Sequence, residues 1–287
     1  MTSRTACGPR GTAQKARWAR SRRRWAKWSW WGPWGPAGSS AAFHMATLGL
    51  DVILLEKQEL GRDKVCGDGL TPSAVRELVS MGMDTTGWQR NRGLRVIGGG
   101  HLLHFPWPEQ ASFPSYGMAR PRALLDRDLA EHAAAAGARL LTGVTVTGPV
   151  TSPTGRVTGV EARPTSRVAY PGIEGPTTFT APLVVDAGGV SARLATAVGR
   201  TKNERRPMGV AVRAYFRSPR AQDAWMESRL ELWDGTPGKS DLLPGYGWIW
   251  SVGEGLVNVG LGSVSSRAQA TAIDYRAVFN RWMDNVP

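Results

Sequence analysis

The sequence contains few cysteines and no long apolar run. Cys7 and Cys66 are its only cysteines, which excludes a disulfide framework and a cysteine-rich zinc cluster. A reducing, intracellular compartment is therefore the default expectation. No stretch approaches the roughly 18 consecutive apolar residues of a membrane-spanning helix. With 287 residues and a mass of 31.0 kDa, the chain is long enough to bury a core as one large or two modest domains.

Acidic residues are absent from the first 50 positions. This stretch holds nine Lys and Arg residues and no Asp or Glu, while the rest of the chain carries 27 bases and 23 acids. The formal net charge of +13 therefore lies mainly in the N-terminal leader. Six of the 13 tryptophans also fall within the first 34 residues. A basic, tryptophan-rich leader of this kind has three interpretations.

The leader could be an arm that binds nucleic acid through phosphate contacts and base stacking, or a targeting peptide, or the product of a shifted reading frame. The basic residues are followed by too short an apolar segment for a targeting peptide. Tryptophan has the single codon TGG, and a frame displaced by one nucleotide reads NTG, which encodes Val when N is G. Residues 27–33, Lys-Trp-Ser-Trp-Trp-Gly-Pro, then permit Glu-Val-Val-Val-Val-Gly-Ala. We favour this interpretation, in which residues 1–30 are aberrant or disordered and nucleic acid is not the partner.

A glycine-rich turn, a helix-like segment and a short apolar strand follow the leader. Gly35 and Gly38 occupy the second and third glycine positions of a G-x-G-x-x-G pattern, where the backbone approaches a pyrophosphate and the helix packs against a sheet. Residues 39–48 are predicted to form that helix, with its first amides facing the phosphates. Residues 52–55 predict a buried parallel strand. Glu56 ends it 18 residues after Gly38, where a carboxylate can accept hydrogen bonds from ribose hydroxyls.

The rest of the chain alternates between helical and strand-like segments. We expect a helix capped by Ser73 and another that ends at Gly137. The expected helices span residues 73–81, 122–136 and 270–283, and the expected strands lie within 93–105 and at 140–146, 155–162, 178–182, 183–187, 208–216, 228–233, 247–251 and 256–261. The three strands between residues 140 and 182 are separated by turn-rich segments, which is typical of a small antiparallel meander.

A series of short motifs occurs in a fixed order along the chain. They are Gly35-Pro-Ala-Gly38-Ser, Glu56, Arg62-x-Lys-x-Cys-Gly-Asp-Gly69, Arg122-x-x-x-Asp126, Gly188-Gly-Val-Ser191, Pro244-Gly-Tyr-Gly-Trp248 and Asn258-Val-Gly260. Together they resemble the geranylgeranyl reductase family of flavoproteins, a branch of the FAD-dependent fold shared with aromatic hydroxylases. The likeness covers roughly residues 31–287 and is strongest to actinobacterial members that act on menaquinone.

The resemblance implies an α/β fold, with a Rossmann-like parallel sheet and β-meander that bind FAD and an antiparallel sheet for substrate. The discontinuous FAD-binding domain would comprise residues 31–91 and 117–204. The substrate domain would comprise residues 92–116 and 205–265, and residues 266–287 would begin a C-terminal part that this chain truncates.

The implied reaction is the reduction of a C=C bond in a geranylgeranyl or menaquinone-type lipid, with hydride from flavin N5. The implied partners are the prenyl lipid and an electron donor that the sequence does not identify, and the implied location is the cytoplasmic surface of a membrane. One alternative keeps the fold and changes the reaction to aromatic hydroxylation. Another is an inactive fragment or a nucleic-acid-binding protein that depends on the leader.

The resemblance also assigns residues to the site. Gly35, Ala37 and Gly38 would face the pyrophosphate, Glu56 the adenosine ribose, and the backbone of Val146 the adenine. Cys66, Gly67 and Gly69 would line the isoalloxazine, with Cys66 as the catalytic candidate, and Arg122 would reach the phosphate or ribityl chain. Tyr246 and Trp248 would form a wall for the prenyl chain.

Each of these residues also has a structural interpretation. Cys66 could be an inert buried thiol, Arg122 a solvated base at a helix terminus, and the aromatic residues plain core. One position departs from the pattern of the wider superfamily, because Gly188 stands where an Asp is usual. Asp186 lies two residues earlier.

We predict that the chain as written does not hold FAD and is not an active enzyme. Trp28, Trp30 and Trp31 would occupy Val-sized positions of the first strand, and overpacking costs roughly 1–3 kcal/mol per site against a total stability of about 5–15 kcal/mol. Lys27 adds a charge that must escape burial, and Pro33 cannot take the positive φ available to glycine. The visible spectrum of the purified chain should therefore lack stoichiometric flavin, whereas a frame-restored, full-length version should be yellow. Stoichiometric FAD in the unaltered chain would contradict this prediction.

Overall fold

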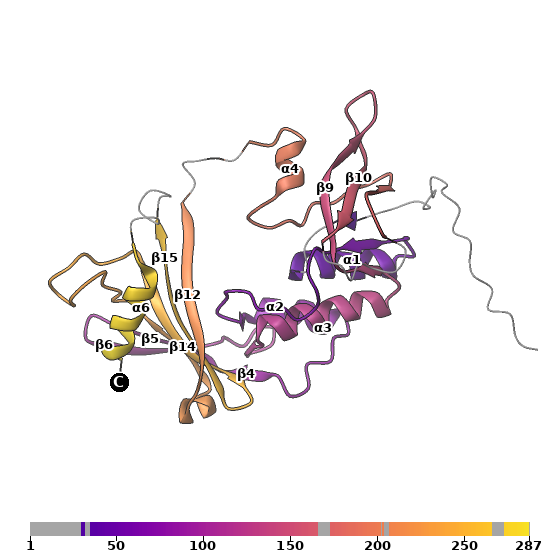
Figure 1. Cartoon of the computed structure of the whole chain (residues 1–287). Helices are drawn as coiled ribbons and strands as arrows, with labels where there is room; N and C mark the ends of the chain where they lie inside the picture. The colour runs from indigo at the N-terminus through magenta and orange to yellow at the C-terminus, as the bar shows by residue number, and fades with distance from the viewer. Residues whose placement is uncertain are drawn as a thin grey trace, which may run out of the picture.

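The computed structural model describes residues 30–31, 35–165, 173–201, 203, 207–265 and 273–286. The leader up to residue 29 and Pro33 lie outside the described residues, so the expectations for them stay predictions. Figure 1 shows the elements along the chain, with a layer that contains α1 and α3 on one side and a large sheet with α6 on the other.

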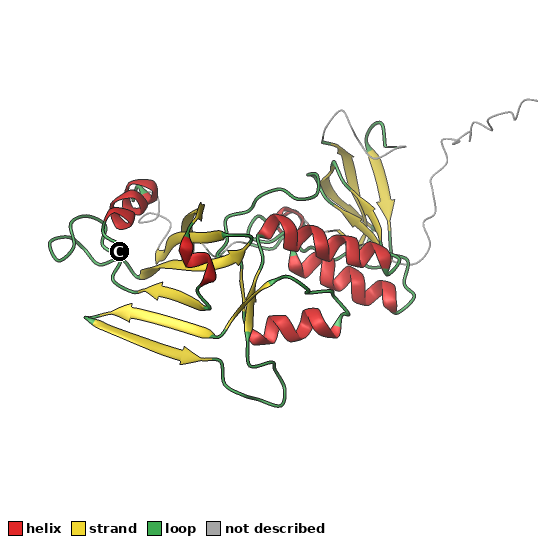
Figure 2. Cartoon of the chain, turned by 90° about the horizontal axis from the view of Figure 1, so that it is seen from below, coloured by secondary structure: helices red, strands yellow, loops and turns green. Residues whose placement is uncertain are grey.

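The N-terminal half of the molecule contains a three-stranded parallel sheet. Its order is β1 (Trp30–Trp31), β2 (Ile53–Leu55) and β8 (Arg139–Leu141). Helices α1 (Pro36–Thr47) and α3 (Arg122–Ala135) lie side by side against it, as Figure 2 shows. Small and branched side chains fill the space between the helices and the sheet, because Ala42, Leu54 and Ala133 are fully buried there. The β1-α1-β2 unit that the glycine pattern predicts is therefore present.

An antiparallel meander follows β8, as the sequence predicts. It is formed by β9 (Val144–Thr151), β10 (Val157–Pro164) and β11 (Thr177–Thr180), in the order β11-β10-β9. Its apolar side chains share a core with β2, in which Ile53, Val144 and Phe179 are buried. The meander is thus attached to the end of the parallel sheet where Glu56 lies.

A small sheet and one helix connect this half to the rest of the chain. The strands are β3 (Gly69–Leu70), β7 (Gly117–Ala119) and β4 (Gln89–Asn91), and the helix is α2 (Pro72–Ser80). Met118 of β7 is fully buried in the cluster that α2 and α3 share. The segment that contains Cys66 leads from β2 of the parallel sheet into β3 of this small sheet.

A six-stranded sheet forms the second half of the molecule (Figure 1). All neighbouring strands are antiparallel except the pair β13 and β5. The order is β12 (Met208–Arg217), β15 (Leu256–Ser265), β14 (Gly245–Gly253), β13 (Trp225–Arg229), β5 (Gly93–Gly98) and β6 (His101–Pro106). Two further short helices are α4 (Arg193–Ala197) and the 3₁₀ helix η1 (Pro219–Gln222).

The two faces of this sheet have different neighbours. Helix α6 (Tyr275–Asp284) covers one face, where Ile249 and Val259 pack against Val278. The opposite face carries Trp248 and Trp250, which pack with Ala119 of β7. The sheet therefore turns its tryptophans toward the half of the molecule that contains the parallel sheet.

Several sequence-based expectations about helix ends were wrong by a few residues. Helix α1 begins at Pro36 rather than Ser39, because proline is well suited to a first helical turn. Thr71, not Ser73, caps α2, and its hydroxyl accepts a hydrogen bond from Ala74 N at 3.5 Å. The last described helix begins at Tyr275, where Asp274 caps it; residues 270–272 of the expected helix lie outside the described residues.

Three strand predictions also need correction. Residues 140–146 form parts of two strands, β8 and β9, because the chain turns at Gly143, whose φ is +63°. Residues 183–187 do not form a strand and contain only a single bridge, at Asp186. The strand expected at residues 228–233 is β13, which begins and ends about four residues earlier, at Trp225–Arg229.

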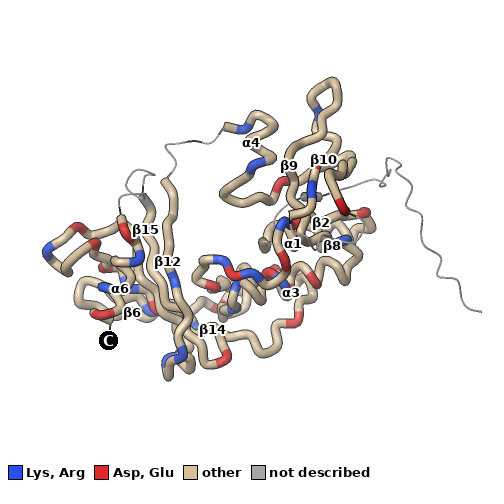
Figure 3. Tube along the Cα trace, in the orientation of Figure 1, with Lys and Arg blue, Asp and Glu red and all other residues tan. Residues whose placement is uncertain are grey.

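Charges of both signs alternate along the described elements (Figure 3). One buried charged cluster lies on β13, where Glu227 is only 3% exposed. Its carboxylate accepts hydrogen bonds from Arg220 Nη2 at 2.6 Å and Arg229 Nε at 2.8 Å. Burial disfavours this charge, but the hydrogen bonds and charges of the two arginines outweigh it and lower the pKa of Glu227. Glu227 is therefore a buried carboxylate that stabilises the sheet without contacting the Cys66 segment.

Candidate functional site

The start of α1 has the features of a phosphate site. Gly35 is the N-cap residue, with an extended backbone and no side chain to cap the helix. Gly38 and Ser39 are buried in the first turn. Among the residues that the structure describes, the buried Ser39 Oγ has no hydrogen-bond partner. A helix start with open amides and a buried hydroxyl without a partner fits the pyrophosphate of a dinucleotide.

Glu56 lies at the same edge of the parallel sheet. It follows β2 directly and is 2% exposed. Its backbone N donates to Leu141 O at 2.9 Å, and its backbone O accepts from Val144 N at 2.8 Å. The side chain accepts a hydrogen bond from Gln58 N at 3.0 Å, and residues 57–62 line a cavity of about 350 Å³ beside it. The carboxylate is therefore held in place where β2 ends.

Val146 belongs to the meander rather than to the parallel sheet. It is half-buried in β9, opposite Ala162 of β10. The loop before α4 is held by Asp186, whose carboxylate accepts hydrogen bonds from Gly188 N at 2.7 Å and Ala195 N at 2.9 Å. The aspartate two residues before Gly188 thus organises this glycine turn.

The segment from Asp63 to Gly69 contacts the tryptophan-bearing face of the six-stranded sheet at several points; it is called the Cys66 loop below. Trp250 Nε1 donates to Gly67 O at 2.6 Å. Asn258 Nδ2 donates to Cys66 O at 2.9 Å and to Asp68 Oδ2 at 2.8 Å. The structure therefore brings Cys66, Gly67 and Gly69 to the sheet face that carries Trp248. These residues can thus belong to a single site.

Gly67 shows why this loop needs a residue without a side chain. A Cβ atom built on Gly67 would lie 2.7 Å from Trp250 Cζ2. The loop and the indole are thus in direct contact, and Gly67 is a packing residue in addition to any role toward the flavin.

Arg122 begins α3 close to the Cys66 thiol. Its guanidinium donates to Asp126 at 2.9 and 3.1 Å, and the ammonium of Lys64 contacts the same carboxylate. Burial disfavours the charge of Arg122, but the hydrogen bond and charge of Asp126 outweigh it and raise its pKa. Burial lowers the pKa of Lys64 in spite of the same partner. Arg122 is therefore ion-paired and mostly buried, and it lies on the Cys66 side of the site.

The aromatic row of β14 is graded in exposure. Tyr246 is 44% exposed, whereas Trp248 is only 5% exposed. The ring centroids of Tyr246 and Trp248 lie 5.9 Å apart, as do those of Trp248 and Trp250. Trp248 Nε1 also donates to Asn258 Oδ1 at 2.9 Å. Tyr246 is thus the member of the row open to a ligand, and Trp248 supports it from within the core.

Sequence reasoning missed several residues of this site. Asp68 and Asn258 stand inside quoted motifs, but nothing in the motifs indicates that their side chains meet. Tyr215 and Arg213 stand in an ordinary strand pattern, although both contact the Cys66 loop. Their pairing depends on how β12 lies beside β15, which local sequence does not specify.

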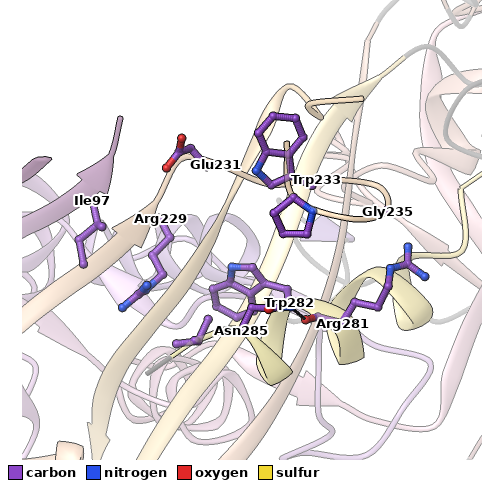
Figure 4. Close-up of a pocket in the computed structure, with 10 residues that line it drawn as sticks. Ile97, Arg229, Glu231, Trp233, Gly235, Arg281, Trp282 and Asn285 are labelled. Carbon is purple, nitrogen blue, oxygen red and sulfur yellow. Dashed lines mark hydrogen bonds between the residues drawn. The ribbon is translucent and has the colours of Figure 1, made fainter. Parts of the chain in front are cut away.

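A separate cavity of about 310 Å³ lies on the α6 face of the six-stranded sheet. Figure 4 shows the indoles of Trp233 and Trp282 in it, with Arg229 and Arg281 at its sides. A Cβ atom built on Gly247 of β14 would lie 2.2 Å from Trp282. The cavity is thus on the opposite face of β14 from Trp248 and is separate from the Cys66 loop.

A β-α-β unit with an acid at the end of its second strand, a meander and an antiparallel sheet together define a flavoprotein fold of the aromatic hydroxylase type. A family model described as an FAD binding domain matches residues 34–268. The chain belongs to this family, and FAD is its cofactor. The described part of the chain contains no helix long and apolar enough to cross a membrane.

Known proteins with similar sequences are reductases by name. A menaquinone reductase from Mycolicibacterium smegmatis is 38% identical over 250 residues, which cover 86% of this chain and 57% of that protein. Digeranylgeranylglycerophospholipid reductase 1 from Methanosphaera stadtmanae is 29% identical over 245 residues, covering 83% and 54%. These relatives confirm the resemblance to geranylgeranyl reductases. The chain spans a little more than half the length of each.

Solved structures confirm the fold. A geranylgeranyl bacteriochlorophyll reductase-like protein from Thermoplasma acidophilum superimposes with a TM-score of 0.70 at 22% identity, covering 91% of this chain and 62% of that chain. Flavin-dependent halogenases share the same fold at 18–21% identity. The fold alone therefore does not decide which reaction follows flavin reduction.

Gly67→Ala should destabilise the protein by about 1–3 kcal/mol, the usual cost of overpacking, because the new methyl group would meet the Trp250 indole. Gly209→Ala in β12 is the matched control, since a Cβ atom there meets nothing within 4 Å, and its effect should stay within about 0.5 kcal/mol. Urea unfolding of the two variants and the parent measures both effects. Equal stabilities for all three proteins would show that the loop does not rest on the indole.

Proposed function

We propose that the protein is an FAD-dependent oxidoreductase that reduces a C=C bond in the isoprenoid chain of a lipid. The observation that carries the proposal is the attachment of the Cys66 loop to the aromatic face of the six-stranded sheet. Two reductases with similar sequences support the substrate class. Their names specify a quinone and a glycerophospholipid, and the feature that these two molecules share is an isoprenoid chain. Reduction of the isoprenoid chain, rather than of either head group, accounts for both names.

The parallel-sheet half would bind the adenosine diphosphate part of FAD. The amides after Gly35, with Ala37 and Gly38, would face the pyrophosphate, and Glu56 would accept from the ribose hydroxyls. The backbone of Val146 would contact the adenine. Arg122, already paired with Asp126, would place its guanidinium near the phosphate or ribityl chain. The small side chains at positions 35, 37 and 38 support this assignment, since they leave the helix start open.

The Cys66 loop would hold the isoalloxazine against the sheet. Bound FAD supplies the hydride, and the chain binds the ring, orients it and keeps water away. Gly67 and Gly69 would let the ring approach the backbone. Cys66 is half-buried beside Arg122. Its Sγ would deliver a proton to a substrate carbon, and the guanidinium would face the thiolate that remains.

The six-stranded sheet would receive the substrate. Residues 31–91 and 117–204 would form the FAD-binding domain, and residues 92–116 and 205–265 the substrate domain. Tyr246 would contact the prenyl chain directly, backed by Trp248. Because such a chain is mostly buried in lipid, the enzyme would work in peripheral contact with the cytoplasmic surface of a membrane. A separate electron donor must reduce FAD again after each turnover.

The proposal predicts that a frame-restored, full-length version of the protein, loaded with FAD and reduced beforehand, will saturate a prenyl double bond. The substrates to offer are a menaquinone and a digeranylgeranyl lipid in detergent micelles, and the product gains two hydrogen atoms for each bond reduced. Mass spectrometry of the extracted lipid measures this gain, with the same protein in oxidised form as the control. Hydroxylation of phenols without any change in either lipid would favour the aromatic hydroxylase alternative and contradict the proposal.

A further inference from the structure

Asp68 has an unusual backbone and an unusually buried side chain. Asp68 is only 1% exposed. Its φ of +62° lies in the left-handed region, which most residues other than glycine avoid and which aspartate enters when its side chain is hydrogen-bonded. The contacts of the carboxylate supply such hydrogen bonds.

Three hydrogen-bond donors from three different elements meet on this carboxylate. Tyr215 OH of β12 donates to Oδ2 at 2.5 Å, and Asn258 Nδ2 of β15 donates to the same oxygen at 2.8 Å. The backbone N of Arg122, the first residue of α3, donates to Oδ1 at 3.1 Å. One side chain thus joins the Cys66 loop, the six-stranded sheet and the helix that lies against the parallel sheet.

The pattern of partners requires a carboxylate. Burial raises the pKa of Asp68, while the hydrogen bonds from Tyr215, Asn258 and Arg122 N and the charge of Arg213 oppose that shift. Every hydrogen bond that this side chain makes is accepted, not donated. An amide at this position would place an N–H group against at least one of these donors, and a buried donor without an acceptor is unfavourable.

The same residue sets the environment of the Cys66 thiol. Asp68 N lies 3.4 Å from Cys66 Sγ and donates to it, and Asn258 holds both Cys66 O and the Asp68 carboxylate. Arg213 adds a further attachment, because its guanidinium stacks 4.1 Å from the Tyr215 ring and donates to Lys64 O at 3.0 Å. Movement of Asp68 would therefore move Cys66.

We propose that Asp68 is the positioning residue of this site: its carboxylate fixes the Cys66 thiol relative to the sheet that would receive the substrate. The consequence for catalysis rests on the proposed function, whereas the control of the thiol does not. Asp68 acts through Tyr215, Asn258 and the start of α3, and it needs no contact with the flavin or the lipid.

Alkylation of Cys66 in the folded protein, measured without added flavin, tests this directly. The probe is iodoacetamide, and peptide mapping separates Cys66 from Cys7. Asp68→Asn should speed the alkylation of Cys66 about tenfold or more, the ratio expected when hydrogen bonds to a charged group no longer hold a segment closed. Tyr215→Phe keeps the ring over Arg213 and removes one donor, so it should give a smaller increase, about threefold.

Glu227→Gln is the matched control. It also replaces a buried carboxylate with an amide and should destabilise the sheet, but its contacts lie with arginines outside the Cys66 loop. Its alkylation rate should stay within about twofold of the parent. If Asp68→Asn fails to fold, as circular dichroism would show, Tyr215→Phe decides the question. Rates in Tyr215→Phe and any folded Asp68→Asn equal to the parent, or an equal increase in Glu227→Gln, would overturn the proposal.

The thiol measurement is independent of the reaction. Absence of lipid reduction in the flavin-loaded, frame-restored version, with a clear effect of Asp68→Asn on Cys66, would remove the proposed function and leave the role of Asp68 toward the thiol intact. Lipid reduction by the flavin-loaded protein, with no effect of Asp68→Asn on the thiol, would support the proposed function and overturn the role of Asp68.

Discussion

The Asp68 carboxylate is the interaction on which the rest of the site depends. It caps α3 from outside the helix, because Pro121 at the N-cap position offers no polar side chain. It also holds β12 and β15 through Tyr215 and Asn258. Each hydrogen bond to a charged group contributes about 1.5–3 kcal/mol, which is enough to maintain the left-handed backbone at this position. This buried anion thus links elements of both halves of the molecule.

Small residues pack against large side chains around this anion. Glycines face tryptophans on both sides of the contact: Gly67 of the loop lies against Trp250, and Gly260 of β15 lies against Trp248. The indoles in turn donate to a loop carbonyl and to Asn258, so their polar atoms are satisfied within the core. The aromatic row therefore serves first as the surface on which the Cys66 loop rests. Only Tyr246 extends far enough into the open to meet a ligand.

The sequence predicted the elements that are determined by residues close together in the chain. The β1-α1-β2 unit, Glu56 at the end of β2, the meander and the helix ending before Gly137 follow from glycine spacing, apolar runs and turn residues. The apolar residues 183–187 contain only a single bridge, at Asp186, so the apolar run by itself did not predict how far this segment pairs with a neighbour. Tyr215 and Asp68 are separated by 147 residues, and their contact depends on the register between β12 and β15. The motif residues were thus predictable, and the network that joins them was not.

Amide hydrogen exchange at Arg122 tests the central claim most directly. The first amides of a helix have no acceptor within the helix and normally exchange quickly. The Arg122 amide instead donates to Asp68 Oδ1 at 3.1 Å. The account predicts that in the native protein this amide exchanges as slowly as amides in the middle of α3, and that Asp68→Asn accelerates it selectively. Rapid exchange at Arg122 in the parent protein, at the rate of an uncapped helix start, would contradict the account.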